Sequence, residues 1–139
     1  MYQPKISIVT IVKNGALTLE KTIDSVANQS YKNVEYLIID GGSTDATLEI
    51  IRNHENVIDF YLSELDSGIV DAFNKGIENS SGDYIFFLNC GDSLKNNNVI
   101  HEVVAEYLTY KPKCFVGQVM LELGSDSGYR VAGKKIGRV

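Results

Sequence analysis

Short apolar runs alternate with segments of helical periodicity along most of this chain. The runs are rich in β-branched residues and predict strands over residues 6–12, 34–39, 58–62, 83–88 and 114–121. Between the runs, apolar residues recur at the i, i+4 and i+7 spacing of amphipathic helices. Strands that alternate with helices favour a parallel sheet joined by right-handed crossovers. The sequence therefore predicts the α/β fold class, with a mainly parallel sheet and flanking helices.

Three of these elements carry expectations about burial. Residues 83–88 are apolar over most of their length, which predicts a strand that is buried on both faces. Residues 58–62 include an acid, Asp59, so this strand is expected near an edge of the sheet. The helix that follows Gly68 is expected to bury one apolar row and to expose the opposite polar row. The apolar row consists of Ile69, Phe73 and Ile77, and the polar row of Asp71, Asn74, Lys75 and Glu78.

The composition is that of one soluble globular domain, with 139 residues of which 44% are hydrophobic and 22% charged. The net charge of −5 argues against a sequence-independent nucleic-acid binder, which normally shows a basic face. Two cysteines, Cys90 and Cys114, are too few for a disulfide framework, so a reducing compartment is expected. No apolar stretch reaches the roughly 18 residues that span a bilayer, and residues 1–5 do not resemble a signal peptide. We therefore expect a cytoplasmic location.

Polar side chains follow four consecutive predicted strands. These positions are Thr10 to Asn14, Asp40, Asp66, and Asn89 to Asp92. The carboxyl ends of parallel strands line one crevice, which is where open α/β sheets bind ligands, so we expect these side chains to lie close together. Asp92 is the residue placed to hold a divalent cation, because phosphate sites commonly bind Mg²⁺ through one or two carboxylates and oxygens of the substrate.

Simpler interpretations of the same residues remain open. Residues 90–93 also have the composition of a plain turn, and Asp40 can bond the amides of the following glycines as an Asx turn. Lys75 could help to neutralise a diphosphate, or it could be an exposed helix cation. The chain contains neither a P-loop nor a G-x-G-x-x-G motif. It also lacks the acidic pair that a signalling receiver domain needs after its first strand.

Four blocks of the sequence resemble the inverting family 2 glycosyltransferases of the GT-A fold, in the branch that builds bacterial surface polysaccharides. The blocks are Ile6 to Asn14, Ile38 to Asp45, Ser63 to Ile77, and Gly82 to Asp92. They stand in the family's order and at its spacing over residues 5–121. The resemblance implies a Rossmann-like nucleotide-diphospho-sugar transferase fold, truncated, in which residues 1–121 form the donor-binding domain. Residues 122–139 are then expected to be a flexible tail or the start of an acceptor region.

The resemblance also implies a nucleotide-diphosphate sugar as donor, usually a uridine one, and a glycan or lipid-linked acceptor. The residues implied in donor binding are Thr10, Asn14, Asp40, Asp66, Asn74, Lys75 and Asn89. Thr10 and Asn14 would lie by the nucleoside, and Asp40 would lie by its base. Asn89 to Asp92 takes the place of the family's D-x-D segment, with Asp92 as the carboxylate nearest a Mn²⁺ or Mg²⁺ ion.

The sequence departs from the family's pattern in two ways. Asn89 and Gly91 replace acids found in many relatives, and Gly41 stands where many relatives carry an aspartate that reads the base, which leaves uridine specificity open. Family members also usually continue well beyond this length, into acceptor contacts and a general base. An inverting transfer needs such a base to deprotonate the attacking hydroxyl, and no convincing candidate follows Leu121.

Two classes of function are therefore expected. The first is a glycosyltransferase or its donor-binding half, in the cytoplasm or at the inner face of the membrane, with peripheral membrane association through a region beyond this chain. The second is a non-catalytic nucleotide-sugar binding or interaction module that retains the fold. An uncovered sheet edge would also invite a homodimer. No nucleic-acid partner is expected.

Overall fold

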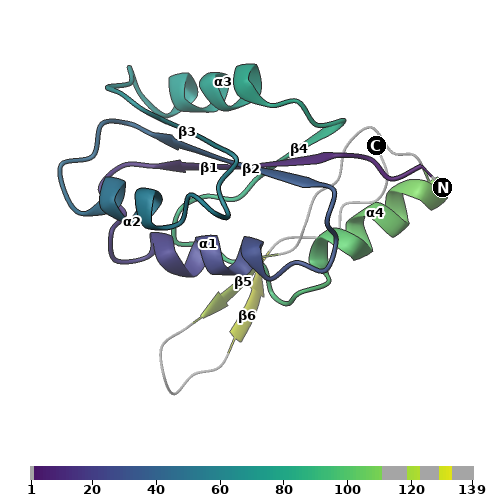
Figure 1. Ribbon diagram of the computed structural model, residues 1–139. Coiled ribbons are helices and arrows are strands. Elements are labelled where there is room, and N and C mark those ends of the chain that lie inside the picture. Colours follow the sequence, from purple (N-terminus) through teal and green to yellow (C-terminus); the bar gives the residue numbers. More distant parts are fainter. Residues whose placement is uncertain (1, 111–118, 123–128, 133–139) are drawn as a thin grey trace. The chain divides into compact units, whose positions relative to one another are not determined.

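The computed structural model of the protein describes residues 2–110, 119–122 and 129–132. The chain divides into two compact units, Met1–Val104 and Ala105–Val139. The first unit contains a four-stranded, all-parallel sheet in the order β3-β2-β1-β4 (Figure 1). Helices follow the strands along the chain and flank this sheet. The predicted α/β class with a parallel sheet is confirmed.

The strands of the main sheet are β1 (Ile6–Val12), β2 (Val34–Asp40), β3 (Phe60–Ser63) and β4 (Tyr84–Phe87). The helices are α1 (Leu19–Ala27), α2 (Thr47–Asn53), α3 (Ile69–Asn79) and α4 (Val99–Tyr110). Within the residues described, no helix is both long and apolar enough to cross a membrane. The register of β1 on β2 sets Ile6 beside Val34 and Val12 beside Asp40. The two central strands therefore end together, and the loops that follow them start from the same edge.

Two short strands outside the main sheet pair with each other. β5 (Val119–Glu122) runs antiparallel to β6 (Tyr129–Ala132). The prediction of a fifth strand that continues the parallel pattern over residues 114–121 is therefore wrong for the part described, and residues 114–118 lie outside the described residues. Strands joined by so short a connection pair as antiparallel, because a parallel return needs a crossover of about a dozen residues or more. The expected domain boundary at residue 121 stays a prediction.

Side chains alternate between the two faces of the main sheet, and each face has its own core. The larger core lies between the sheet and α1, α2 and α4, and its fully buried members include Ile8, Ile23 and Ile51. The smaller core lies between the sheet and α3, around Val9 and Leu37. Figure 1 shows α3 on one side of the sheet and α1 with α2 on the other. The sheet is thus a middle layer, and its carboxyl edge is lined by loops.

α3 packs on the sheet through small side chains. Its buried residues are Ala72 and Gly76, whereas Ile69 and Ile77 are 63% and 48% exposed. A Cβ atom at Gly76 would lie 2.6 Å from Val9 Cγ1, so the helix approaches β1 as closely as a glycine allows. The prediction that Ile69 and Ile77 are buried is wrong, because Ala72 and Gly76 occupy the part of α3 that lies closest to the sheet.

β4 is an edge strand in the described part of the sheet. It pairs with β1, and its side chains Ile85 and Phe87 are 36% and 39% exposed. Phe87 contacts Phe73 of α3 edge-on, with ring centroids 4.8 Å apart. The prediction that this strand is buried on both faces is therefore wrong for the face that carries Ile85 and Phe87. β3 forms the other edge, as expected for the strand that follows Asp59.

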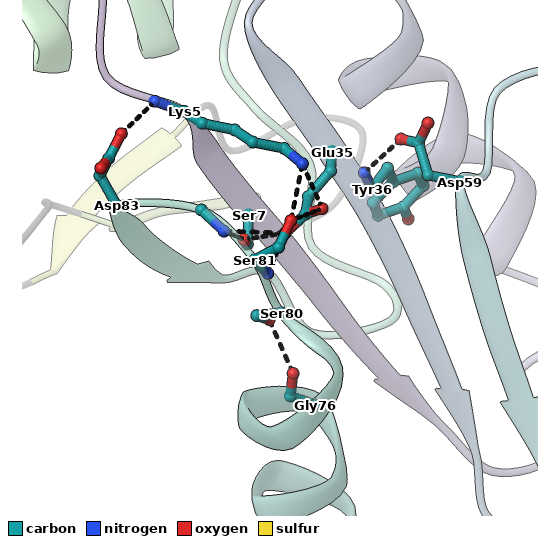
Figure 2. A network of polar contacts seen from close by, with 10 residues as sticks. Lys5, Ser7, Glu35, Tyr36, Asp59, Gly76, Ser80, Ser81 and Asp83 are labelled. Carbon is teal, nitrogen blue, oxygen red and sulfur yellow. Dashed lines mark hydrogen bonds and ion pairs between the residues drawn. The ribbon is translucent and has the colours of Figure 1, made fainter.

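A carboxylate joins three segments at the amino end of the sheet (Figure 2). Glu35 of β2 is largely buried and lies 2.7 Å from Lys5 Nζ. It also accepts hydrogen bonds from the hydroxyls of Ser7 and Ser81 and, over 3.0 Å, from the Gly82 N–H. Burial raises the pKa of Glu35, but these contacts outweigh it and lower the pKa from 4.5 to about 2. The side chain is therefore ionised in the folded protein and fastens β1 and the start of β4 to β2.

Candidate functional site

Hydrogen bonds tie the loops after β1 and β2 into one unit. Asn14 adopts a left-handed backbone conformation, with a φ of 51°, and its Oδ1 accepts a bond of 2.8 Å from the Thr44 N–H. The Asn14 N–H in turn donates to the Ser43 hydroxyl over 2.7 Å. The next N–H, that of Gly15, donates to the Thr47 hydroxyl over 2.9 Å. The predicted residue Asn14 therefore lies at the carboxyl edge, with its backbone and side chain fixed.

Asp40 is the last residue of β2, and its side chain forms hydrogen bonds within the protein. The residue is 1% exposed, and its carboxylate accepts bonds of 3.1 Å from the Ser43 N–H and 2.6 Å from the Ser63 hydroxyl, as well as one from the Ser43 hydroxyl. This is close to the Asx-turn interpretation, although the bonded amide belongs to Ser43 and not to the glycines. A carboxylate accepts about four hydrogen bonds, so few sites are left for a ligand. The role of Asp40 at a nucleotide base stays a prediction.

Asp66 reaches the same turn from the loop after β3. A Cβ atom at Gly41 would overlap Asp66 Oδ2, so this carboxylate rests directly against the Gly41 backbone. Its other oxygen accepts a bond of 3.1 Å from the Gly68 N–H, at the start of α3. The structure therefore brings Asp66 beside the residue that follows Asp40, and the missing side chain at position 41 makes the room for it.

Lys75 is held by two carboxylates on the α3 side of the site. Its Nζ lies 2.9 Å from Glu64 Oε1 and 3.0 Å from Asp71 Oδ2, and its side chain is 17% exposed. The contacts with Glu64 and Asp71 raise the pKa of Lys75, and the bond from Lys75 lowers the pKa of Asp71. Lys75 is thus neither an unpartnered surface cation nor a free charge. Two of the three N–H donors of its ammonium group are engaged by these carboxylates.

Two of the predicted residues are not brought into these contacts. Thr10 lies inside β1 and is fully buried, with its hydroxyl 3.0 Å from the Tyr36 hydroxyl. Burial raises the pKa of Tyr36, so this is a neutral polar contact within the larger core. Asn74 is exposed on α3, one position before Lys75. Roles for Thr10 and Asn74 in donor binding stay predictions.

The segment after β4 continues along β1 and then turns. The Leu88 N–H donates to the Val9 carbonyl over 3.0 Å, which extends the strand pairing beyond β4. Gly91 then adopts a φ of 94°, and the Asp92 N–H donates to the Asn89 carbonyl over 3.0 Å. Asn89 and Asp92 are both exposed. Across residues 2–110, 119–122 and 129–132, the Asp92 carboxylate accepts no hydrogen bond, which leaves its oxygens open to a ligand.

Cys90 lies between this segment and the loop after β1. A Cβ atom at Gly15 would lie 2.5 Å from Cys90 Sγ, so the two loops are in close contact. Burial raises the pKa of the Cys90 thiol, and the negative charges of Asp45 and Asp92 raise it further. The thiol is therefore neutral, and Asp45 and Asp92 both lie close enough for their charges to act on it.

A family model described as glycosyl transferase family 2 matches residues 7–136, which is most of the sequence. The chain belongs to glycosyl transferase family 2. An uncharacterized glycosyltransferase of Haemophilus influenzae is 38% identical in an alignment of 102 residues that covers 71% of this chain and 41% of that protein. A PGL/p-HBAD biosynthesis glycosyltransferase of Mycobacterium bovis is 33% identical over 125 residues, 87% of this chain and 49% of that protein. This family 2 chain spans less than half the length of either relative.

Solved structures of longer proteins share the fold of this family 2 chain. S. aureus TarS, crystallised in complex with UDP-GlcNAc, matches with a TM-score of 0.71 at 20% identity, over 77% of this chain and 32% of that one. The mannosyltransferase PcManGT of Pyrobaculum calidifontis, in complex with GDP-Man and Mn²⁺, matches with a TM-score of 0.70 at 19% identity, over 77% of this chain and 33% of that one. The expected GT-A transferase fold is confirmed.

The segment after β4 in this family 2 chain suits a divalent cation whose coordination is completed by substrate. Among the described residues, no three His, Cys, Asp or Glu side chains gather to hold a metal. Asp92 nevertheless offers an exposed carboxylate with no internal partner in that part of the chain, and Asn89 offers an amide oxygen. Mg²⁺ prefers oxygen ligands and often takes one or two carboxylates, filling its shell with phosphates and waters. The residues present fit such an ion as a shared site with a diphosphate.

Several polar residues that shape this edge are not among the predicted donor-binding residues. They are Thr22, Ser43, Asp45, Thr47 and Ser63. Bonds from the Thr47 hydroxyl and N–H, together with one from Ala16, lower the pKa of Asp45 and fix the start of α2. Thr22 and Thr47 are fully buried. A hydroxyl among the apolar positions of an amphipathic helix is the signal that could have identified these two threonines, because a buried hydroxyl needs a hydrogen-bond partner.

Proposed function

We propose that the carboxyl edge of the sheet binds a nucleoside-diphosphate sugar together with a divalent cation, and that the chain forms the donor-binding half of a glycosyltransferase. The observation that carries this proposal is the open carboxylate of Asp92, on a segment fixed to the same edge as Asn14 and Asp66. Membership of family 2 supports the reaction class. TarS with UDP-GlcNAc and PcManGT with GDP-Man and Mn²⁺ support the ligand class, since both share the fold.

In this proposal the residues of the edge have different roles. Asp92 holds the cation, with Asn89 beside it, and Asn14 and Asp66 orient the nucleoside. When bound, a divalent cation neutralises charge that develops on the leaving diphosphate. The tied loops after β1 and β2 keep Asn14 in place before the ligand arrives, which lowers the cost of ordering the site on binding. A uridine donor is the first choice to test, and a guanosine donor is the second.

The acceptor and the setting of the reaction are part of the same proposal. We place the transfer in the synthesis of a cell-surface glycan, with a glycan or lipid-linked acceptor, at the inner face of the cytoplasmic membrane. The M. bovis relative named for PGL/p-HBAD biosynthesis supports a role in surface glycans. Peripheral membrane association and a homodimer stay predictions from the sequence.

A non-catalytic nucleotide-sugar binding module is the second candidate function. Asp92 carries the only carboxylate in residues 89–92, which favours a weaker cation site than an acidic cluster would give. Both candidates require donor binding, and only the first requires turnover. Release of free UDP from a UDP-sugar in the presence of this chain, with or without an acceptor, separates them: measurable release excludes the non-catalytic module.

A thermal-shift titration tests donor binding. The ligands are UDP, UDP-GlcNAc and GDP-Man, each with and without Mn²⁺. A ligand at about a hundred times its Kd adds roughly 2.7 kcal/mol, which raises the Tm of a domain of this size by several degrees. We expect the shift to require both nucleotide and Mn²⁺, and to disappear in Asp92→Asn.

The control is Asp24→Asn, which removes an exposed carboxylate from α1 and should leave the shift intact. Absence of a shift with every nucleotide, in a folded sample, would contradict the proposal. Equal loss of the shift in Asp24→Asn and Asp92→Asn would show that net charge, and not the Asp92 site, controls binding.

A further inference from the structure

The hydroxyl of Thr22 joins α1 to the segment that carries Asp92. Thr22 lies within α1 and is fully buried, and its neighbours Leu19 and Ile23 belong to the larger core. Its Oγ1 accepts a hydrogen bond of 3.0 Å from the Gly91 N–H and donates one of 2.8 Å to the Asp92 carbonyl. Because the core fixes α1 on the sheet, this hydroxyl is a rigid point of attachment for the segment.

The two bonds bracket the backbone that sets the direction of the Asp92 side chain. The Gly91 N–H and the Asp92 carbonyl are the two ends of one dipeptide, so a group that holds both restricts the torsion angles between them. Gly91 has a φ of 94°, and glycine is the residue with the widest choice of backbone conformations. Without the Thr22 hydroxyl, the dipeptide would therefore have more conformations available and the Asp92 carboxylate more directions.

We propose that Thr22 is a positioning residue for the cation that Asp92 holds. This inference rests on the proposed function, because it needs Asp92 to be a cation ligand. Asp92 carries the only carboxylate in residues 89–92. The affinity of this segment for a cation therefore depends on the direction of one side chain. Groups that orient metal ligands typically change metal affinity or activity by about 10- to 100-fold when they are removed.

α1 also provides a matched control for this role. The Ser25 hydroxyl accepts a hydrogen bond of 3.1 Å from the Leu94 N–H, two positions after Asp92 in the same loop. Ser25 therefore supports the loop without touching the backbone of Gly91 and Asp92. If both hydroxyls were merely structural, Thr22→Val and Ser25→Ala would lower the Tm and leave the cation affinity unchanged.

The experiment measures the Kd for Mn²⁺ by electron paramagnetic resonance of the free ion, in the full chain with saturating UDP. Thr22→Val keeps the shape of the side chain and removes both hydrogen bonds, and we expect the Kd to rise about tenfold or more. Thr22→Ser restores the hydroxyl, and Ser25→Ala removes the neighbouring one. Both should bind Mn²⁺ as the unmodified chain does. Asp92→Asn serves as the reference for a lost ligand.

The outcomes separate this inference from the function on which it rests. A loss of affinity in Thr22→Val that Thr22→Ser restores supports the positioning role, whatever the change in Tm. An unchanged Kd in a folded Thr22→Val, alongside loss in Asp92→Asn, overturns the positioning role and leaves the proposed function standing. Failure of the unmodified chain to bind Mn²⁺ with UDP overturns both. If Thr22→Val does not fold, Thr22→Ala removes the same two bonds and is judged by the same results.

Discussion

The two ends of the parallel sheet use their carboxylates in different ways. At the amino end, Glu35 is 13% exposed and is bonded by Lys5, by two serine hydroxyls and by backbone N–H groups (Figure 2). At the carboxyl end, Asp92 is exposed, and across the described ranges its side chain accepts no hydrogen bond. One carboxylate is thus satisfied within the fold, and the other is open to a ligand from outside.

This difference separates stability from binding. A carboxylate whose bonds are all internal contributes to the free energy of unfolding, because its removal leaves buried donors without a partner. A carboxylate without internal bonds can be removed at little cost to the fold, and the loss is felt only when the ligand binds. Changes at the amino end should therefore alter stability and leave ligand affinity unchanged, and changes at Asp92 should do the reverse.

The largest effect on stability is expected from Glu35→Ala. This variant removes the ion-pair partner of Lys5 Nζ and the acceptor of the Ser81 N–H, and it should lower the free energy of unfolding by about 3 kcal/mol, measured by urea denaturation. Glu78→Ala, which removes an exposed glutamate from α3, should cost less than about 0.5 kcal/mol. The Kd for UDP with Mn²⁺ should not change in either variant. A folded Glu35→Ala protein that binds UDP more weakly would break the comparison.

The bonds of Glu35 also make stability depend on pH in the acid range. The pKa of Glu35 is lowered to about 2 in the folded protein, from 4.5, so the folded state favours the carboxylate. Its contribution is complete above about pH 4.5 and is lost as the pH falls towards 2, and the shift corresponds to at most about 3 kcal/mol. Urea denaturation of the unmodified chain and of Glu35→Gln between pH 7 and pH 3 measures it. A difference between the two that stays constant over this range would contradict the assignment.

A smaller effect on stability is expected from Gly91→Ala. Thr18 Oγ1, the nearest atom to the new Cβ, lies 3.5 Å away, so the cost comes from the φ of 94° and should be about 1–2 kcal/mol. The affinity for Mn²⁺ should fall as well, because the change displaces Asp92. Gly68→Ala is the control, since it also places an alanine at a positive φ, of 126°, in open space. Equal Mn²⁺ affinities in the two variants would count against a cation site at Asp92.

The smallest effect is expected from Lys75→Met. Lys75 is paired with Glu64 and Asp71 near the surface, and such pairs contribute about 1 kcal/mol or less. Urea denaturation should therefore show a loss below that value, and the loss should shrink further at high salt. A loss well above about 1 kcal/mol would mean that the ion pairs of Lys75 contribute to stability as strongly as the internal bonds of Glu35 do.

The strands of the main sheet, and the meeting of the polar loops at one edge, could be predicted because both depend on local pattern and on topology. β-Branched runs and helical spacing define β1, β2 and α1, and parallel strands bring their carboxyl ends to one edge. The burial of α3 could not be predicted in this way, because Ala72 and Gly76 carry little apolar surface. Their small size lets the helix approach Val9, and that close contact is visible only in three dimensions.

The long-range contacts of polar residues could not be predicted from the sequence. A local turn at Asp40 is one of the interpretations that the sequence leaves open, and its bond with Ser43 is close to it, but the bond from Ser63 arrives from a different strand. The bond from Thr22 to the Asp92 carbonyl crosses 70 positions of the chain. Contacts of this range follow from the packing of α1 on the sheet, and no local motif encodes them.

Paramagnetic broadening by Mn²⁺ in the presence of UDP tests the central claim most directly, because it compares the two ends in one NMR spectrum of the ¹⁵N-labelled chain. A seven-residue strand such as β1 is about 20 Å long, so an ion at Asp92 lies far from Glu35 and its partners. We predict that the amide signals of Gly15, Gly91 and Asp92 broaden, that those of Ser7 and Gly82 stay sharp, and that Asp92→Asn abolishes the effect. Broadening that is uniform over the chain, or that centres on the amino end, would contradict the account.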